Sequence, residues 1–310
     1  MSDAERTQLI DAMHWVRDEC PGQAGGCGTF ETAHPPGSSN FNWDIDEFFL
    51  DHIRYSSHAH GQWKFFPWHR KYLKEYESKL QLYDPCVTLA WWDWTQDIED
   101  DPGRTGDFEW IKNNNASGFH NDWGVLSNVD SIAGSSTNDG MKVGRFQCGN
   151  SGDSYNALGN NWRTQSSSLG YCLWRNTDPS YMQYMPDSAD VADYLSRSSY
   201  DSGWDSFMEF EGWPHGAPHV MVGGGGTTSS QFGQMGNGRS PTDPIFFLHH
   251  AAVDKLWDTW QHNDASNFND LGGSGTTRAI VSSHCTAAGA RIPGPALRSH
   301  ATSTVLPNCQ

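Results

Sequence analysis

The chain has 310 residues, a formal net charge of −17 and 36% hydrophobic residues, and it contains 15 Trp, 15 Phe and 10 Tyr. The negative charge argues against a nucleic-acid or anionic-membrane partner, because both attract positively charged surfaces. No apolar run approaches the roughly 20 residues that a transmembrane helix requires. A chain of this length can bury a sizeable core within one domain, and this core must be rich in aromatic side chains.

The first hundred residues contain three segments whose apolar residues recur with helical spacing. We expect these helices over residues 4–18, 45–54 and 67–83. Pro67 suits the first position of its helix, where an N–H group would have no partner. Residues 20–42 are rich in Gly and Pro and predict an irregular loop. The apolar run 86–97 contains three tryptophans and is too short for a separate helix, so we expect it to cross the core in extended form.

The middle of the chain carries weaker signals. Between residues 97 and 201 the composition changes to Gly, Ser, Asn and Asp, and only 189–197 predicts a helix. Residues 204–222 predict a helix-like unit that is interrupted by Pro214 and Pro218.

The strongest helix signal is the stretch 240–262, SPTDPIFFLHHAAVDKLWDTWQH. Asp243 is expected to cap its N-terminus, and Pro244 to occupy the first helical position. The residues that follow are polar and irregular. We therefore expect one domain over 1–310, with a core over about 4–262 and a tail over 263–310 in which no lid domain is evident.

The seven cysteines show no C-x-x-C pair, so metal-finger spacing is absent. We expect six of them to form three disulfide bonds between cysteines that lie close in the sequence, namely Cys20–Cys27, Cys148–Cys172 and Cys285–Cys309. Cys86 is then left without a disulfide partner. Such pairs favour an oxidising compartment and a secreted protein, whereas a reduced protein with buried thiols is the alternative. No signal-peptide pattern precedes Asp3, which fits a mature secreted form or a cytosolic protein.

Eight histidines fall into two groups. The groups are His52, His58, His60 and His69, and then His215, His219, His249 and His250. His215 and His219 are four residues apart and share one helical face, a spacing suited to one metal ion. Neighbours on a helix diverge by about 100°, so only one of His249 and His250 can point into the same site.

The first group needs a break in the chain to converge. His60 and His69 would face opposite ways on one continuous helix, but Gly61 and Pro67 allow them to lie on separate segments. Three imidazoles per group then result, without a clear carboxylate or thiolate ligand. Zinc sites and non-haem iron sites usually include such ligands, whereas copper accepts an all-imidazole set.

Four motifs together carry a family resemblance: FFPWHRKYLKEYE, TLAWWDWTQD, PHGAPHVMVGG and SPTDPIFFLHHAAVDKLW. They resemble the tyrosinase, catechol oxidase and haemocyanin family of coupled binuclear copper proteins, over residues 46–97 and 209–261. The resemblance implies a mainly α fold with a central four-helix bundle that holds a dicopper site, long irregular loops and little β structure. By the same resemblance, the first copper is bound by His52, His60 and His69, and the second by His215, His219 and His250. His58 is a near competitor for His52, and His249 lies behind the ligands.

The resemblance also implies the activity, which is oxidation of o-diphenols to o-quinones, with O2 as co-substrate and small phenols as partners. Tyrosinases also hydroxylate monophenols, and one hypothesis for the family requires a water held by a Glu and an Asn. Glu211 matches that Glu, but Gly216 stands where the Asn is expected. The sequence therefore favours a catechol oxidase (polyphenol oxidase) with weaker monophenol hydroxylation over a true tyrosinase. Val220 offers the substrate an apolar contact.

Two further residues, Met235 and Asn237, are expected to line the entrance. Many relatives carry a cysteine near the position of His60 that bonds to the imidazole, but His58 stands two residues before it here, so we expect no thioether. A haemocyanin-like O2 carrier is the main alternative function, although nothing after His262 resembles a shielding domain. A zinc or iron hydrolase is disfavoured by the missing carboxylates. Oxidation of o-aminophenols at the same copper pair is a third alternative.

Overall fold

A computed structural model describes residues 1–17, 44–100, 102–103, 123, 146, 163–164, 171–173, 175, 179–201, 205–224 and 233–272. The α-helices are α1 (Asp3–Arg17), α2 (Asp44–Arg54), α3 (Ser56–Ala59), α4 (Phe65–Tyr83), α5 (Trp94–Asp100), α8 (Ser188–Ser196), α9 (Trp213–Gly223) and α10 (Ile245–Asn263). Short 3-10 helices are η2 (Pro179–Tyr184), η3 (Phe207–Glu211), η5 (Gln234–Gly236), η6 (Ser240–Thr242) and η7 (Asn267–Asn269).

The fold is mainly α, as predicted. Within the described ranges, β structure is confined to one antiparallel pair, in which β1 (Arg163–Thr164) lies beside β2 (Tyr171–Cys172). The predicted loop 20–42, most of the Gly- and Ser-rich middle region and nearly all of the tail lie outside the described residues. None of the helices that the structure describes is long and apolar enough to cross a membrane.

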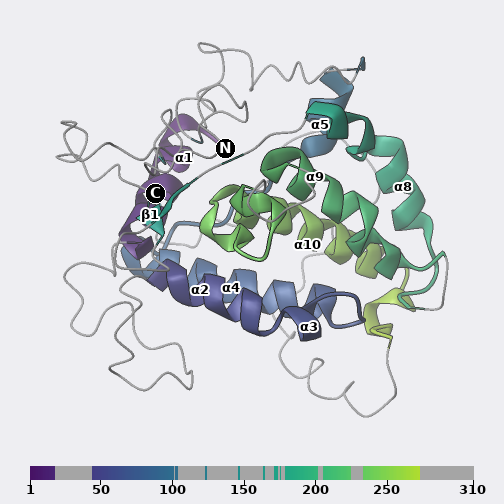
Figure 1. Cartoon of the computed structure of the whole chain (residues 1–310). Coiled ribbons are helices and arrows are strands. Elements are labelled where there is room, and N and C mark those ends of the chain that lie inside the picture. The colour runs from purple at the N-terminus through teal and green to yellow at the C-terminus, as the bar shows by residue number, and fades with distance from the viewer. Residues whose placement is uncertain are drawn as a thin grey trace.

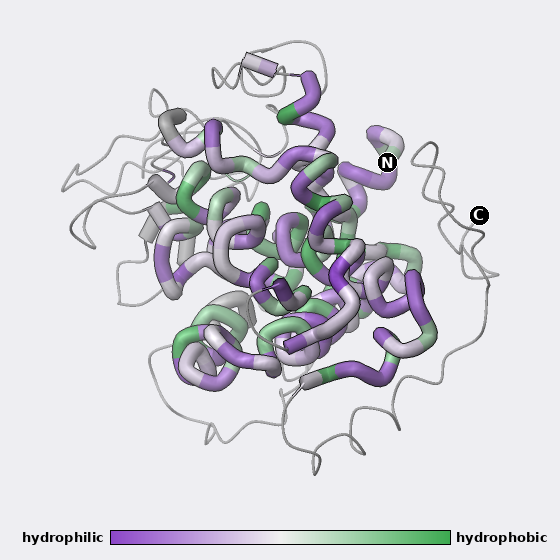
Figure 2. Tube along the Cα trace, turned by 90° about the vertical axis from the view of Figure 1, so that its right-hand side faces the viewer, coloured by the Kyte–Doolittle hydropathy of each residue, from purple (hydrophilic) through white to green (hydrophobic). Residues whose placement is uncertain are grey.

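The central helices are α9 and α10, with α2 and α4 along one side and α5 and α8 at the opposite edge (Figure 1). Hydrophobic and hydrophilic positions alternate along the tube of these helices (Figure 2), as expected when each helix buries one face. The core is strongly aromatic. Its largest fully buried side chains include Trp94, Trp123, Trp257, Trp260 and Tyr76.

The predicted helix boundaries are close to those observed, and the differences have local causes. Helix α4 begins at Phe65, so that Pro67 lies inside the first turn, where its missing N–H still costs no hydrogen bond. The run 86–97 is only partly extended, because its last residues from Trp94 onward form α5. In the extended part, the Trp92 N–H donates to the carbonyl of Leu248 on α10 at 3.0 Å.

The expected interruption at Pro218 is wrong. Helix α9 continues through Pro218 to Gly223, whereas Pro214 lies in the first turn, where η3 gives way to α9. A proline inside a helix removes one hydrogen bond but does not force the helix to end. Here both Ala217 and Met221 are buried in the core, and this packing keeps the segment helical.

The expectation that Cys86 is left over is also wrong, because Cys86 forms a disulfide bond. Each of the other six cysteines was assigned to a local pair. Apart from Cys172, the cysteines of those pairs lie outside the described residues, so the three pairs stay predictions. Sequence proximity misled because a disulfide depends on the distance between residues in the fold.

The start of α10 is fixed by a buried ion pair. The Arg175 Nε and Nη2 atoms donate to the two carboxylate oxygens of Asp243, each at 2.7 Å, and both side chains are fully buried. The helix begins at Ile245 with Pro244 in the N-cap position, one residue later than predicted, and Asp243 Oδ1 accepts the N–H of Ile245 at 3.0 Å in the first turn. The helix that carries His249 and His250 is thus anchored at its first turn.

Candidate metal centre

Seven histidines gather in two clusters at the centre of the fold. The first consists of His52, His60 and His69, and the second of His215, His219, His249 and His250. Within each cluster one potential ligand atom per residue lies within 4.8 Å of the others. His58 is exposed and lies outside both clusters.

The first cluster takes one histidine from α2, one from the end of α3 and one from α4. Each imidazole uses Nδ1 for a hydrogen bond to a main-chain carbonyl: His52 to Gly238 at 3.1 Å, His60 to Ser56 at 3.2 Å and His69 to Phe65 at 2.8 Å. Because a carbonyl oxygen only accepts, the hydrogen is on Nδ1 and the Nε2 atoms carry free lone pairs. The convergence of His60 and His69 depends on the turn at Gly61, whose φ is +69°.

The second cluster is built on α9 and α10. His215 and His219 donate from Nδ1 to the carbonyls of Glu211 and Met235, both at 2.8 Å. The Nε2 atom of His250 lies 3.3 Å from that of His215 and 3.2 Å from that of His219. The three Nε2 atoms therefore converge on one point, as the ligands of one metal ion do.

His249 belongs to the cluster by position, but both of its ring nitrogens are occupied. The indole N–H of Trp94 donates to His249 Nδ1 at 3.2 Å, and His249 Nε2 donates to the carbonyl of His215 at 3.0 Å. No nitrogen of this ring is left for a metal. His249 instead ties α5, α9 and α10 together behind the second cluster.

Burial keeps these imidazoles neutral. It lowers the pKa of His52 to about 3 and that of His219 to about 4, and it holds the pKa of His69, His215 and His250 well below the ordinary value. Neutral imidazole is the form that binds a metal ion. The Nε2 atoms of His52 and His69 are buried and find no hydrogen-bond partner among the described residues, which costs free energy unless an ion satisfies them. The donor set thus fits copper.

Three residues expected near the substrate are Glu211, Gly216 and Val220. Glu211 Oε1 accepts the Gly61 N–H at 2.6 Å, and burial raises the pKa of this carboxyl to about 7 against the effect of that hydrogen bond. Apart from its chain neighbours and the backbone of its own helix, no described atom lies within 4 Å of a Cβ placed on Gly216, so this position has room for a side chain. Val220 is half-buried beside His219.

The two residues expected at the entrance have hydrogen bonds to His219 and within their own loop. Met235 is only 1% exposed, and its carbonyl rather than its side chain contacts His219. Asn237 is half-buried, and its side-chain amide donates to the Gly233 carbonyl at 3.0 Å and accepts the Arg239 N–H at 2.8 Å. The amide of Asn237 therefore braces its own loop.

Sequence reasoning missed the groups that orient the imidazoles. Three of the carbonyl acceptors come from the residue four positions before the histidine, and helical geometry could have indicated them. The contact between Trp94 and His249 joins residues that are 155 positions apart, so no local pattern marks it.

Comparison with known proteins identifies the family of this chain. A family model described as the common central domain of tyrosinase matches residues 30–263. Tyrosinase from Streptomyces antibioticus is 32% identical over 233 residues, which cover 72% of this chain and 71% of the relative. Tyrosinase from Streptomyces glaucescens is 33% identical over 214 residues, 66% of this chain and 64% of the relative.

The fold agrees with a solved structure. A single-substitution variant of polyphenol oxidase from Thermothelomyces thermophila aligns with a TM-score of 0.58 and 19% identity, over 88% of this chain and 73% of that chain. The family match covers both histidine clusters, whose buried or half-buried, neutral imidazoles suit copper. The chain therefore belongs to the tyrosinase family of type 3 copper proteins and is a copper-dependent oxidoreductase.

Proposed function

We propose that this chain is a polyphenol oxidase that oxidises o-diphenols to o-quinones with O2, using two copper ions, and that it hydroxylates monophenols only weakly. The observation that carries the proposal is the presence of two separate sets of converging imidazoles with neutral rings. His52, His60 and His69 would hold one ion, and His215, His219 and His250 the other. Bound copper would supply the redox change, in which each diphenol loses two electrons and two protons while O2 is reduced to water.

The residues around the site support a preference for diphenols. One hypothesis links monophenol hydroxylation to a water held by a Glu and an Asn. Gly216 has no side-chain amide that could hold this water. Glu211 is the candidate proton acceptor, because its carboxyl exchanges a proton near pH 7. Val220 would offer the ring of the phenol an apolar contact next to His219. His249 would position the second set of ligands through the carbonyl of His215.

The test is oxygen uptake by the copper-loaded protein with 4-methylcatechol and with p-cresol. Rapid turnover of the catechol with slow turnover of p-cresol is expected. Equal turnover of both would indicate a true tyrosinase, the alternative that the names of the two Streptomyces relatives favour. Reversible O2 binding without turnover of either phenol would indicate an oxygen carrier.

We further propose that residues 1–310 form one domain and that the protein works in an oxidising compartment. The disulfide at Cys86 supports the second proposal, because disulfides persist mainly in such compartments. Peptide mapping without reductant would identify the partner of Cys86. A free Cys86 thiol in protein purified from its native source would contradict the assignment.

A further inference from the structure

His250 differs from the other five imidazoles of the proposed copper site. Each of those five donates from Nδ1 to a main-chain carbonyl. In the part of the chain that the structure describes, the buried Nδ1 atom of His250 has no hydrogen-bond partner. A histidine that binds a metal ordinarily has such a partner, which fixes the orientation of its ring. Something else must therefore hold His250 with Nε2 toward His215 and His219.

Aromatic rings hold it instead. The ring of Phe246, four residues earlier on α10, lies 4.1 Å from the imidazole of His250 with an angle of 31° between the planes. The ring of His69 on α4 stacks on the same imidazole at 4.5 Å and 16°. Residues four apart on a helix lie on the same face, so the backbone of α10 brings Phe246 against His250. The ring of His250 is packed between groups from two helices.

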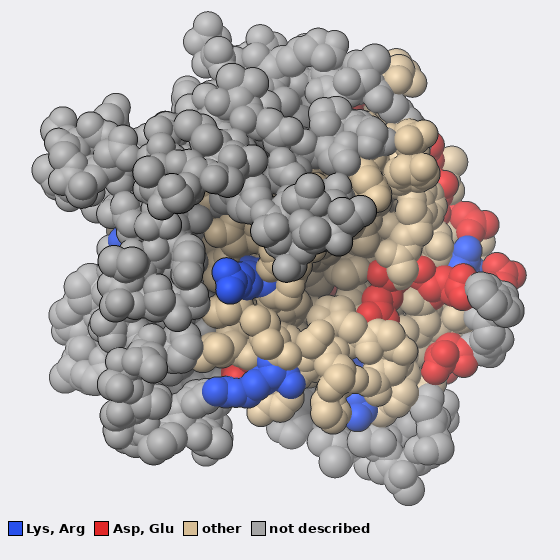
Figure 3. Space-filling model, viewed as in Figure 1, with Lys and Arg blue, Asp and Glu red and all other residues tan. Residues whose placement is uncertain are grey.

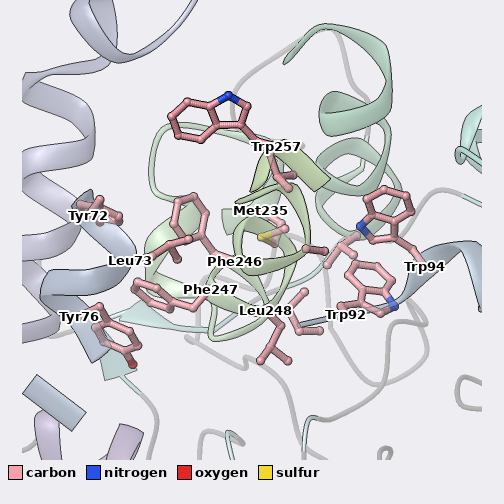
Figure 4. Close-up of a cluster of buried hydrophobic side chains, with 14 of the residues drawn as sticks. Tyr72, Leu73, Tyr76, Trp92, Trp94, Met235, Phe246, Phe247, Leu248 and Trp257 are labelled. Atoms are coloured by element: carbon pink, nitrogen blue, oxygen red, sulfur yellow. The ribbon is translucent and has the colours of Figure 1, made fainter. Parts of the chain in front are cut away.

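Phe246 also reaches ligands of both clusters. Its ring lies 5.3 Å from that of His52 in an edge-on arrangement and 6.0 Å from that of His219. The side chain is fully buried, within the aromatic cluster that faces Tyr72 (Figure 4). A single ring thus contacts imidazoles from α2, α9 and α10.

We propose that Phe246 is a positioning residue that holds the His250 imidazole in the orientation for binding metal, in place of the absent hydrogen bond. This inference rests on the proposed function, in which the two clusters bind two copper ions. Phe246 contacts the histidine ligands and is fully buried. Its loss is expected to weaken the binding of copper at the second cluster.

The neighbouring residue provides a matched control. Phe247 is equally buried on the same helix, but its ring stacks on Tyr76 at 3.6 Å and contacts Phe48 and Tyr72; none of its described ring contacts is with a histidine ligand. Phe246→Leu and Phe247→Leu remove the same ring from the same core. A general loss of packing would affect both variants alike.

The experiment is titration of the metal-free protein with Cu(I) in competition with a colorimetric chelator. The unsubstituted protein should bind two ions, and so should Phe247→Leu with unchanged affinities. In Phe246→Leu the affinity for one of the two ions should fall by about 10- to 100-fold, the range seen when the groups that orient a ligand are lost.

Three results would count against these ideas in different ways. Unchanged affinities in Phe246→Leu, or equal losses in both leucine variants, would overturn the role of Phe246. Failure of the unsubstituted protein to bind two ions would overturn the proposed function itself. If Phe246→Leu does not fold, Phe246→Met keeps more of the packed volume without the ring and is compared with Phe247→Met, with the same expectations.

Discussion

Replacing Asp243 with Asn is expected to be among the most destabilising single changes in this protein. The carboxylate accepts two hydrogen bonds from Arg175 and one from the N–H of Ile245, and both charged side chains are fully buried. Asparagine keeps the shape but removes the negative charge that pairs with the buried guanidinium of Arg175. Breaking a buried ion pair in this way costs about 3–5 kcal/mol.

That cost is a large part of the roughly 5–15 kcal/mol by which proteins are stable. Urea unfolding, monitored by tryptophan fluorescence with the disulfides intact, measures it. With a denaturant slope of about 1–3 kcal/mol/M, the midpoint should fall by roughly 1 M or more. Asp258→Asn is the control on the same helix, because Asp258 is 58% exposed and pairs with Arg70 at 3.9 Å. It should cost about 0–1 kcal/mol.

The double variant Arg175→Met with Asp243→Leu separates the cost of breaking the ion pair from the cost of losing the hydrogen bond to Ile245. Both charges of the pair are removed in it, so it should recover part of the stability that Asp243→Asn loses. The hydrogen bond to Ile245 is still lost, and recovery should therefore be incomplete. A loss below about 1 kcal/mol for Asp243→Asn would refute the reasoning, because the pair would then not be buried as described.

Three further changes test other parts of the structure. Tyr72→Phe should lower the free energy of unfolding by about 1 kcal/mol, because its hydroxyl donates at 2.6 Å to a carbonyl of α2. Tyr76→Phe should cost nothing, because its buried hydroxyl has no partner among the residues that the structure describes. The reverse order in urea unfolding would contradict both assignments. Gly216→Asn should fold normally, because the position is open, and should raise the turnover of p-cresol relative to 4-methylcatechol; an unchanged ratio in oxygen uptake would remove the role of Gly216. The metal-free protein should lose stability as the pH falls from 6.5 toward 3, by about 1.4 kcal/mol per unit for His52 alone, because the folded pKa of about 3 lies below that of the unfolded chain. The other buried histidines add to this loss, whereas Glu211 opposes it because its pKa is raised. Urea unfolding at pH 7 and at pH 5 measures the change. An unchanged free energy of unfolding would refute the claim that the buried histidines are neutral.

Local patterns in the sequence predicted much of this fold. The helical spacing of apolar residues located α1, α2, α4, α8 and α10, and the Gly and Pro positions separated the segments that bring His60 and His69 together. These features depend on residues within one or two turns of each other. A pattern in the sequence records such relations directly.

Relations across the chain were not predictable in this way. The ion pair between Arg175 and Asp243 joins residues that are 68 positions apart, and no sequence pattern near either residue indicates the other. The disulfide at Cys86 was missed for the same reason, because proximity along the chain was the only guide. Helix α9 continues through Pro218 because its residues are buried in the core, although proline disfavours the interior of a helix. In each case tertiary packing outweighed a local rule.

The orientation of the candidate copper ligands shows why side-chain patterns can miss what shapes a site. Met235 and Gly238, in the segment between α9 and α10, supply the carbonyls that hold His219 and His52, one histidine from each cluster. This segment packs so closely on the end of α9 that a Cβ at Gly223 would lie 1.9 Å from the backbone nitrogen of Gly236. Only glycine permits that approach. A residue without a side chain thus lets one short loop orient imidazoles of both clusters through its backbone alone.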